Sequence, residues 1–151
     1  MITPEASCRL RATVQRDGRV RVIARNVTLA VQGSLGLDEK SPDPAALDLL
    51  VSALAADLLT LLGREATRAG VPLHDAELCL DAQLENPLVA LGVVGEAGHA
   101  GATRIAGTLS VRAAGDEEHV RALWERALTR SPVHTTLSRS VPITIDLRLF
   151  A

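Results

Sequence analysis

Alternating apolar and polar residues predict that the chain starts with strands. Apolar side chains occupy every second position over residues 7–15 and again over residues 19–24, which is the period of a half-buried strand. Asp17-Gly18 lies between the two segments and favours a hairpin, because both residues tolerate positive φ. The apolar phase reverses after Asn26, where a turn or bulge would begin a third strand. The expected arrangement is a three-stranded meander.

A long helix is predicted after a loop at residues 32–44, which is rich in glycine and proline. Gly70 is suited to end this helix in the left-handed conformation, and Pro72 follows as a stop. Further leucines lie outside its main apolar face, so the helix is apolar nearly all round and should be buried on more than one side. That burial suggests that a second subunit covers it. The main face, within a helix at residues 45–69, consists of Leu47, Leu50, Val51, Leu54, Leu58, Leu61 and Leu62.

Strands and helices alternate in the rest of the chain. Asp116 is a good N-cap for a helix that ends at Arg130, and its acidic first turn and basic last turn complement the helix dipole. Ser131-Pro132 then has the composition of a second helix start. The remaining predicted elements are strands at 74–85, 88–94, 102–113 and 141–149, with a glycine-rich turn at 95–101.

This order of elements predicts an α+β fold. Hairpin-connected strands with helices on one side are typical of that class. The 151 residues suffice for one domain with a normal core, and no linker divides them, so a single domain at 1–151 is expected. It should contain antiparallel sheets packed on the long central helix and on a second helix.

Composition and charge argue against nucleic-acid binding and metal-dependent functions. Aromatic residues make up 1% of the chain, which argues against stacking platforms for nucleic-acid bases. The formal net charge is −2 and gives no reason to expect a polyanionic partner. The four histidines are scattered without ligand spacing, so we expect no metal. The glycine-rich stretch at 95–101 does not match a phosphate loop, and no cofactor is expected.

A cytoplasmic location is the expectation. The first residues lack the basic and apolar regions of a signal peptide. The apolar stretch at 47–62 is interrupted by Asp48, Ser52 and Asp57, and we predict that it is too short and too polar to span a membrane. The two cysteines have no motif spacing, which favours a reducing compartment.

Three stretches carry a resemblance to a known family. They are "RDGRV" at 16–20, "SPDPAALDLLVSALAADLLTLL" at 41–62 followed by "AGVPL", and "DEEHVRALWERALTRSPVHTTL" at 116–137 followed by "VPITIDL". Together they resemble the OsmC/Ohr family, named for osmotically inducible protein C and organic hydroperoxide resistance protein. Family members commonly read C-P-V-H-x-T-L where this chain reads S-P-V-H-T-T-L. The resemblance spans nearly the whole chain and implies an intertwined homodimer.

The resemblance also implies where redox chemistry would be located. Peroxide-reducing members use one cysteine midway along the central helix and another at the start of the second motif. In this chain those positions fall on Asp57 and Ser131. A peroxidatic group must ionise and then hold an oxidised state on sulfur. The implied redox centre is therefore lost.

The family's helper residues are an arginine in the loop before the helix and an acid at the helix start. No arginine occurs between Arg25 and Arg64, and Lys40 is the nearest cation. Asp48 matches the acid position in one register, whereas alignment from Pro44 shifts that position by two residues. The match of the helper positions is thus incomplete.

Ser131 has two interpretations. As a nucleophile it would need an adjacent base, and His134 is the candidate. As the residue before Pro132 it would instead cap the short helix through the backbone N–H two or three residues on. We favour capping.

Asp57 likewise has two interpretations. A carboxylate at the edge of an apolar helix face needs a partner. We favour an ion pair at a subunit interface, for example with an arginine of the first or second strand. The alternative is a general acid or base in a small apolar pocket.

The two cysteines are not expected to replace the missing pair. Cys8 is predicted on the apolar face of its strand, where a thiol behaves as a small hydrophobe. Cys79 shares its strand face with Asp75, Glu77 and Asp81, a negative surface that disfavours a thiolate.

The leading hypothesis is an OsmC-like homodimer without thiol peroxidase activity that binds a small apolar ligand near Asp48, Asp57, Ser131 and His134, or has a purely structural role. The main alternative is a hydroperoxide reductase or other small-molecule enzyme with an altered site around Asp57, Ser131 and His134. A weaker one is an accessory partner of another protein.

Overall fold

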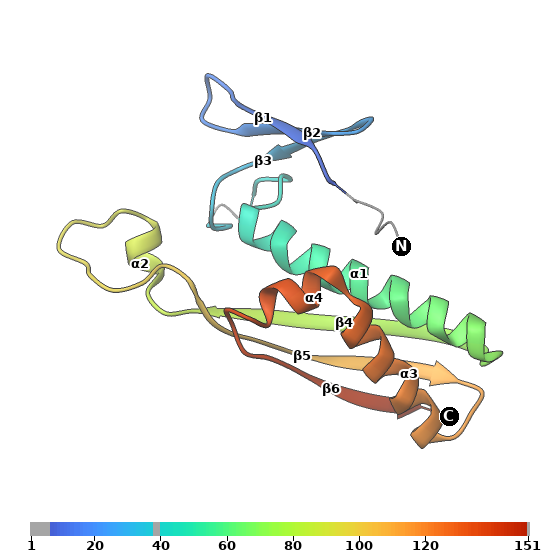
Figure 1. Cartoon of the computed structure of the whole chain (residues 1–151). Helices are drawn as coiled ribbons and strands as arrows, with labels where there is room; N and C mark the ends of the chain where they lie inside the picture. The colour runs from blue at the N-terminus through green and yellow to red at the C-terminus, as the bar shows by residue number, and fades with distance from the viewer. Residues whose placement is uncertain (1–6, 38–39, 151) are drawn as a thin grey trace, which may run out of the picture. The chain divides into compact units, whose positions relative to one another are not determined.

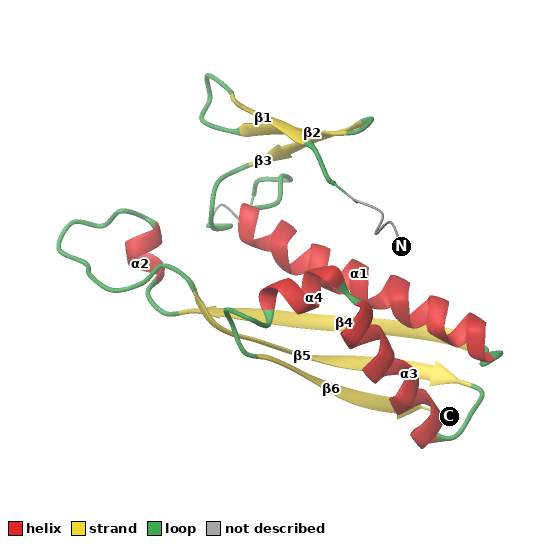
Figure 2. Ribbon diagram, viewed as in Figure 1, coloured by secondary structure: helices red, strands yellow, loops and turns green. Residues whose placement is uncertain are grey.

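Two compact units make up the chain, residues 1–49 and residues 50–151. The computed structural model describes residues 7–37 and 40–150. The first residues, on which the signal-peptide expectation depends, lie outside this range, as do residues 38–39 of the predicted loop. The α+β class is confirmed: helices accompany two small three-stranded sheets (Figure 2).

The first unit contains the predicted meander. Strands β1 (Leu10–Val14), β2 (Val20–Ala24) and β3 (Val27–Val31) pair antiparallel in the order β1-β2-β3. The change of phase near Asn26 is confirmed as a tight turn between β2 and β3, in which Arg25 has a φ of 55°.

The β1–β2 hairpin differs from the prediction. Only Gly18 of the Asp17-Gly18 pair has positive φ, at 85°. Gln15 N–H donates to Arg19 O, and Gly18 N–H donates to Gln15 O at 3.1 Å, so three residues form the loop. A turn closed by a left-handed glycine is the common three-residue hairpin solution.

The central helix α1 (Ala46–Ala69) is confirmed together with its end. Gly70 has a φ of 68°, its N–H donates to Thr67 O, and the N–H of Val71 donates to Ala66 O at 2.9 Å. This paired pattern is a Schellman motif, which satisfies carbonyl groups that the helix end leaves unpaired.

In the second unit, three helices lie on one face of a three-stranded sheet. Strands β4 (Leu73–Leu84), β5 (Ala102–Ala113) and β6 (Ile143–Phe150) form the sheet in that order. The helices α1, α3 (Glu117–Arg130) and α4 (Pro132–Leu137) lie together on one of its faces (Figure 1).

The prediction of purely antiparallel sheets is wrong for β6. Strand β4 pairs antiparallel with β5, but β5 pairs parallel with β6. The physical reason is the connection: α3 and α4 lie between these two strands and form the crossover that a parallel neighbour requires.

The predicted strand piece at 88–94 is also wrong. Its start is the short helix α2 (Pro87–Ala90). The side chain of Asn86 accepts a hydrogen bond from Leu88 N–H at 3.0 Å, and Pro87 follows the cap directly. This combination favours a helix start over a strand.

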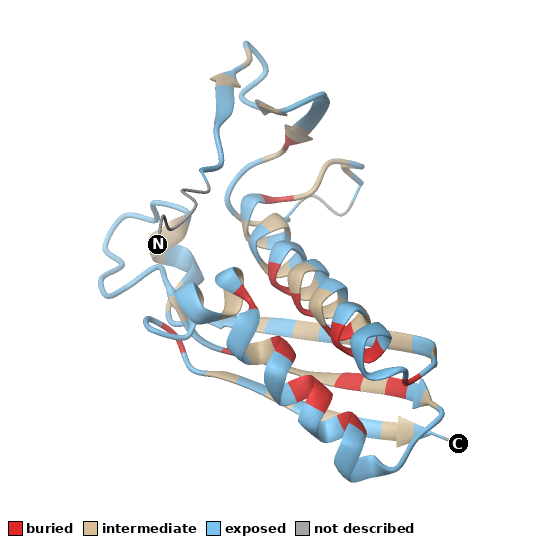
Figure 3. Ribbon diagram, turned by 45° about the vertical axis from the view of Figure 1, so that its right-hand side comes forward, coloured by how far each residue is buried: buried red, intermediate tan, exposed pale blue. Residues whose placement is uncertain are grey.

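The buried core lies between the helices and the sheet of the second unit, as Figure 3 shows. Its fully buried side chains include Leu58 and Leu62 from α1, Leu109 from β5 and Leu123 from α3.

Among the described residues, α1 is the one helix long and apolar enough to cross a membrane by length and composition. This finding contradicts our argument that the segment is too short and too polar to span one. Since a core helix passes the same test and α1 contributes to the core, the finding is weak evidence for a span.

Candidate functional site

Ser131 lies where α3 passes into α4 and is fully buried. Its N–H donates to Ala127 O at 3.0 Å, in the last turn of α3. Its Oγ accepts from the N–H of His134 at 2.9 Å, in the first turn of α4. The predicted capping role is therefore confirmed, and this one residue joins two helices.

Asp57 of α1 is the second partner of the Ser131 hydroxyl. Ser131 Oγ donates to Asp57 Oδ2 at 2.5 Å, and Val133 N–H donates to the same oxygen at 3.2 Å. The structure thus brings together two residues that are 74 positions apart in the sequence. They are the two positions where the resemblance places the family's cysteines.

Within the described residues of the single chain, Asp57 forms no ion pair. Its polar contacts are the hydroxyl of Ser131 and the backbone N–H of Val133. An ion pair with an arginine of a second subunit stays a prediction.

The predicted base for Ser131 is not in place. The ring Nδ1 of His134 lies 3.1 Å from Leu128 O; because a carbonyl only accepts, Nδ1 is the donor there. The hydroxyl proton of Ser131 is directed at Asp57 instead. The prediction that the His134 ring acts as the base of Ser131 is therefore wrong, because Ser131 Oγ contacts the backbone N–H of His134 and not its ring.

Asp48 lies in the first unit, near the start of α1. Its Oδ2 accepts from the N–H of Ala45 at 2.9 Å. A side chain in the first turn that reaches back to the N-cap N–H is half of a capping box. Helix capping is a sufficient local reason for an acid at this position, and its predicted role in ligand binding stays a prediction.

Neither thiol lies in an enclosed site. Cys8 is exposed and precedes β1, so its predicted place on a buried apolar face is wrong. Cys79 is exposed on β4, on the same face as the exposed Glu77 and Asp81, as its alternation predicts. No group of three or more potential metal ligands occurs among the described residues.

Sequence reasoning missed a second polar site next to the first. Glu65 of α1 has only 4% of its surface exposed. It pairs with Arg68 at 3.0 Å, with Arg126 of α3 at 3.3 Å and with Arg130 of α3. We call these four residues the Glu65 cluster.

Opposing effects set the pKa of Glu65. Burial raises the pKa, but the hydrogen bond and charge of Arg130, followed by those of Arg68, lower it by more, so the pKa lies below its ordinary value. The spacing of Glu65 and Arg68 on one helix was a signal for part of this site. The arginines of α3 are distant in the sequence and gave none.

Comparisons with known proteins agree with this fold. The sequence model of OsmC-like proteins matches residues 37–146. An OsmC-like protein from Mycoplasma pneumoniae is 16% identical and has a TM-score of 0.82, with 98% of this chain and 100% of that chain covered.

Two further solved structures are similar. The organic hydroperoxide resistance protein OhrB of Bacillus subtilis is 16% identical, with a TM-score of 0.63 over 95% of this chain and 98% of its own. An organic hydroperoxide resistance protein OsmC from Legionella pneumophila is 14% identical, with a TM-score of 0.64 over 96% and 98%. A search of curated protein sequences gave no match. With most of its length covered by the family model, the chain belongs to the OsmC-like proteins.

Proposed function

We propose that this OsmC-like protein has lost thiol peroxidase activity and binds a small apolar ligand at the interface of a homodimer. The observation that carries the proposal is the contact between Asp57 Oδ2 and Ser131 Oγ at 2.5 Å. This contact joins two oxygens at the pair of positions that the family resemblance assigns to cysteines. Neither oxygen can form the sulfenic acid or the disulfide that thiol peroxidases use.

The homodimer is supported by the apolar surface of the single chain. Leu50 on α1 is 43% exposed, and in the first unit Leu10 and Val14 on β1 are 59% and 76% exposed. Leu10 and Val14 lie four residues apart on β1 and therefore on one face of that strand, and an apolar strand face favours a covering partner. Light scattering at micromolar concentration should therefore give the mass of two chains, and a monomer would contradict this part of the proposal.

Peroxide consumption tests the loss of activity. Purified protein is incubated with cumene hydroperoxide and dithiothreitol, and the remaining peroxide is measured over time. We expect no consumption above background, and no sulfenic acid or Cys8–Cys79 bridge by mass spectrometry. The double variant D57C/S131C, which places cysteines at both family positions, is the positive control. Because its new thiols replace groups in contact, peroxide should oxidise it to a disulfide, whereas the S131C single variant should form none at this site.

The alternative function is hydroperoxide reduction with an altered site. It is favoured by the structural neighbours whose names include organic hydroperoxide resistance. Peroxide consumption by the wild-type chain that disappears in the S131A variant but not in C79S would establish this alternative and exclude the lost-activity proposal. Loss in C79S alone would instead identify Cys79 as the reactive thiol and would also exclude the lost-activity proposal.

The ligand is tested separately, by native mass spectrometry of the purified protein. Retention of a small apolar molecule by the dimer, and its loss in a variant with a larger side chain at the site, such as S131L, would support binding there. The D116A variant serves as a control, since it alters a helix cap elsewhere.

A further inference from the structure

The Glu65 cluster holds more positive charge than its structural role needs. Glu65 is the one charged residue that is buried among the described residues. A buried carboxylate needs hydrogen bonds and one opposite charge to offset its desolvation. Here three guanidinium groups converge on it, so the cluster has one negative and three positive charges.

Most donors of these arginines remain available in the described part of the chain. A guanidinium has five N–H donors, and each of the three makes one contact, with Glu65. The side chains of Arg68, Arg126 and Arg130 are 66%, 46% and 49% exposed. Their unused N–H groups can therefore reach a ligand from solution.

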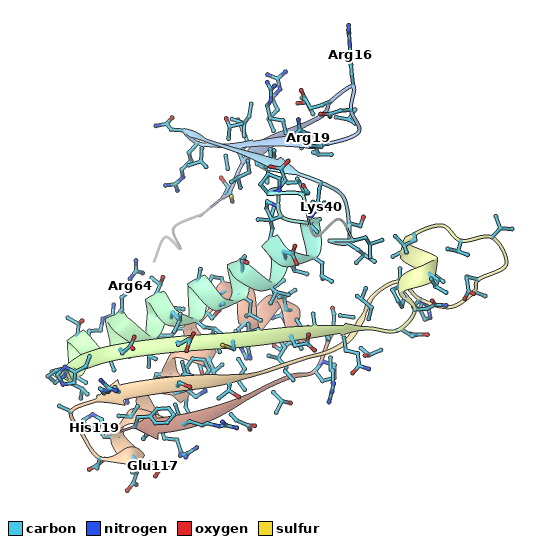
Figure 4. The ribbon with its side chains drawn as sticks, turned by 180° about the vertical axis from the view of Figure 1, so that it is seen from behind. Arg16, Arg19, Lys40, Arg64, Glu117 and His119 are labelled. Atoms are coloured by element: carbon cyan, nitrogen blue, oxygen red, sulfur yellow. The ribbon has the colours of Figure 1, made fainter. Side chains whose placement is uncertain are left out.

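The buried carboxylate also fixes the arrangement. It holds together arginine side chains from α1 and α3 before any ligand binds. The entropy cost of ordering these side chains on binding is therefore reduced. Two nearby arginines lack this arrangement. Arg64, the neighbour of Glu65, points away from the sheet (Figure 4), and Arg121 of α3 is paired one to one with Glu117 at 2.6 Å.

We propose that Arg68, Arg126 and Arg130 form a binding site for a phosphate group. The planar fork of arginine matches phosphate with two parallel hydrogen bonds. A phosphate group carries about −1.5 to −2 charges at pH 7, which complements the excess of two positive charges. The phosphate can be free or part of a monoester, since both present the same oxygens. This site is separate from the Asp57–Ser131 contact and does not depend on the proposed function.

Titration calorimetry with inorganic phosphate tests the site on the full chain, with the ionic strength held constant by sodium chloride. We expect saturable binding to the wild type. The R126Q variant should weaken it about tenfold, in line with the loss of one charge-assisted hydrogen bond. Arg126 makes the longest contact in the cluster, so this variant is the one least expected to disturb folding. R126K keeps the charge but loses the fork, and should bind with intermediate affinity.

R121Q is the matched control, because Arg121 lies on the same helix but outside the cluster. The R121Q variant should bind phosphate with the affinity of the wild type. A parallel titration with phenyl phosphate separates the sources: tighter binding than inorganic phosphate identifies a monoester, and weaker binding identifies the free ion. The proposal is overturned if phosphate does not saturate the wild type in the millimolar range, or if R126Q and R121Q bind equally well.

Discussion

The two compact units contain similar strands with very different burial. In the second unit, Leu109 and Val111 on β5 have none of their surface exposed. In the first unit, Leu10 and Val14 on β1 are 59% and 76% exposed, although they alternate with polar residues as strand residues do. The comparison teaches that alternation predicts a strand and its two faces, but not whether anything covers the apolar face.

The reason for the difference is what each unit contains. In the second unit, α1 and α3 contribute buried leucines to the same core cluster as the sheet residues. The first unit has a sheet of three five-residue strands and only the start of α1. Small sheets need a packing partner for stability, which agrees with the proposed homodimer.

The largest expected effect is in the second unit, at Gly107 of β5. A Cβ at this position would lie 2.0 Å from the carbonyl oxygen of Cys79 on the neighbouring strand, and backbone cannot yield as a side chain can. We expect Gly107→Ala to lower the free energy of unfolding by more than about 3 kcal/mol, the upper end of usual overpacking costs. Urea unfolding measures it. Gly101→Ala is the control, since a Cβ there meets nothing within 4 Å, and an equal cost in both variants would contradict the packing argument.

The comparison of the two units is tested most directly by truncating one leucine in each. Leu58→Ala removes a fully buried side chain and should cost about 3 kcal/mol. Leu10→Ala removes a side chain that is 59% exposed in the single chain and should cost less than about 0.5 kcal/mol when the chain is monomeric.

If the proposed homodimer covers β1, the cost of Leu10→Ala should grow as the protein concentration rises from nanomolar to micromolar. A cost that is small at every concentration would show that this strand stays uncovered, which would remove β1 from the proposed interface.

A smaller effect is expected at the two helix caps of the second unit. Ser131→Ala removes the cap of α4 and also the hydroxyl donor of Asp57, so it should cost about 1–2 kcal/mol. Asp116→Ala removes a cap whose side chain, within residues 7–37 and 40–150, accepts only from the N–H of His119, and it should cost about 1 kcal/mol. Chemical denaturation of both variants gives the difference, and a cheaper Ser131→Ala would argue against a stabilising Asp57 contact.

The smallest expected effect is the acid sensitivity due to Glu65. Its pKa in the folded chain lies below the ordinary value of 4.5. The stability that it contributes is therefore complete above pH 4.5 and is lost as the pH falls through the folded pKa. Glu65→Gln should flatten the decline of the urea midpoint on acidification. Glu125→Gln, which changes an exposed carboxylate of α3, should leave that decline unchanged, and equal slopes in all three proteins would contradict the argument.

Much of the fold could be predicted from local patterns. Asp116 as the cap of α3, Ser131 as the cap of α4 and Gly70 as the end of α1 were all correct. Each of these signals acts within a few residues and is therefore visible in the sequence. The errors at residues 88–94 and at Cys8 have the same cause: a short apolar run does not say which structure it adopts or what surface covers it.

The candidate site was predictable only in part. The resemblance singled out Asp57 and Ser131, whereas the dyad of Ser131 and His134 was wrong because spacing along a helix start does not fix where a ring points. The Glu65 cluster was missed, since two of its arginines come from another helix.

The sequence by itself determined most of the elements and the helix ends at Gly70, Asp116 and Ser131, because periodicity and capping are local properties, and the family resemblance added the pair of oxygen-bearing residues. Only the tertiary structure decided that β6 runs parallel to β5, that the Ser131 hydroxyl donates to Asp57, and that three arginines surround Glu65. These features depend on how distant helices pack on one sheet, and a buried carboxylate acquires its partners from that packing rather than from its neighbours in the chain.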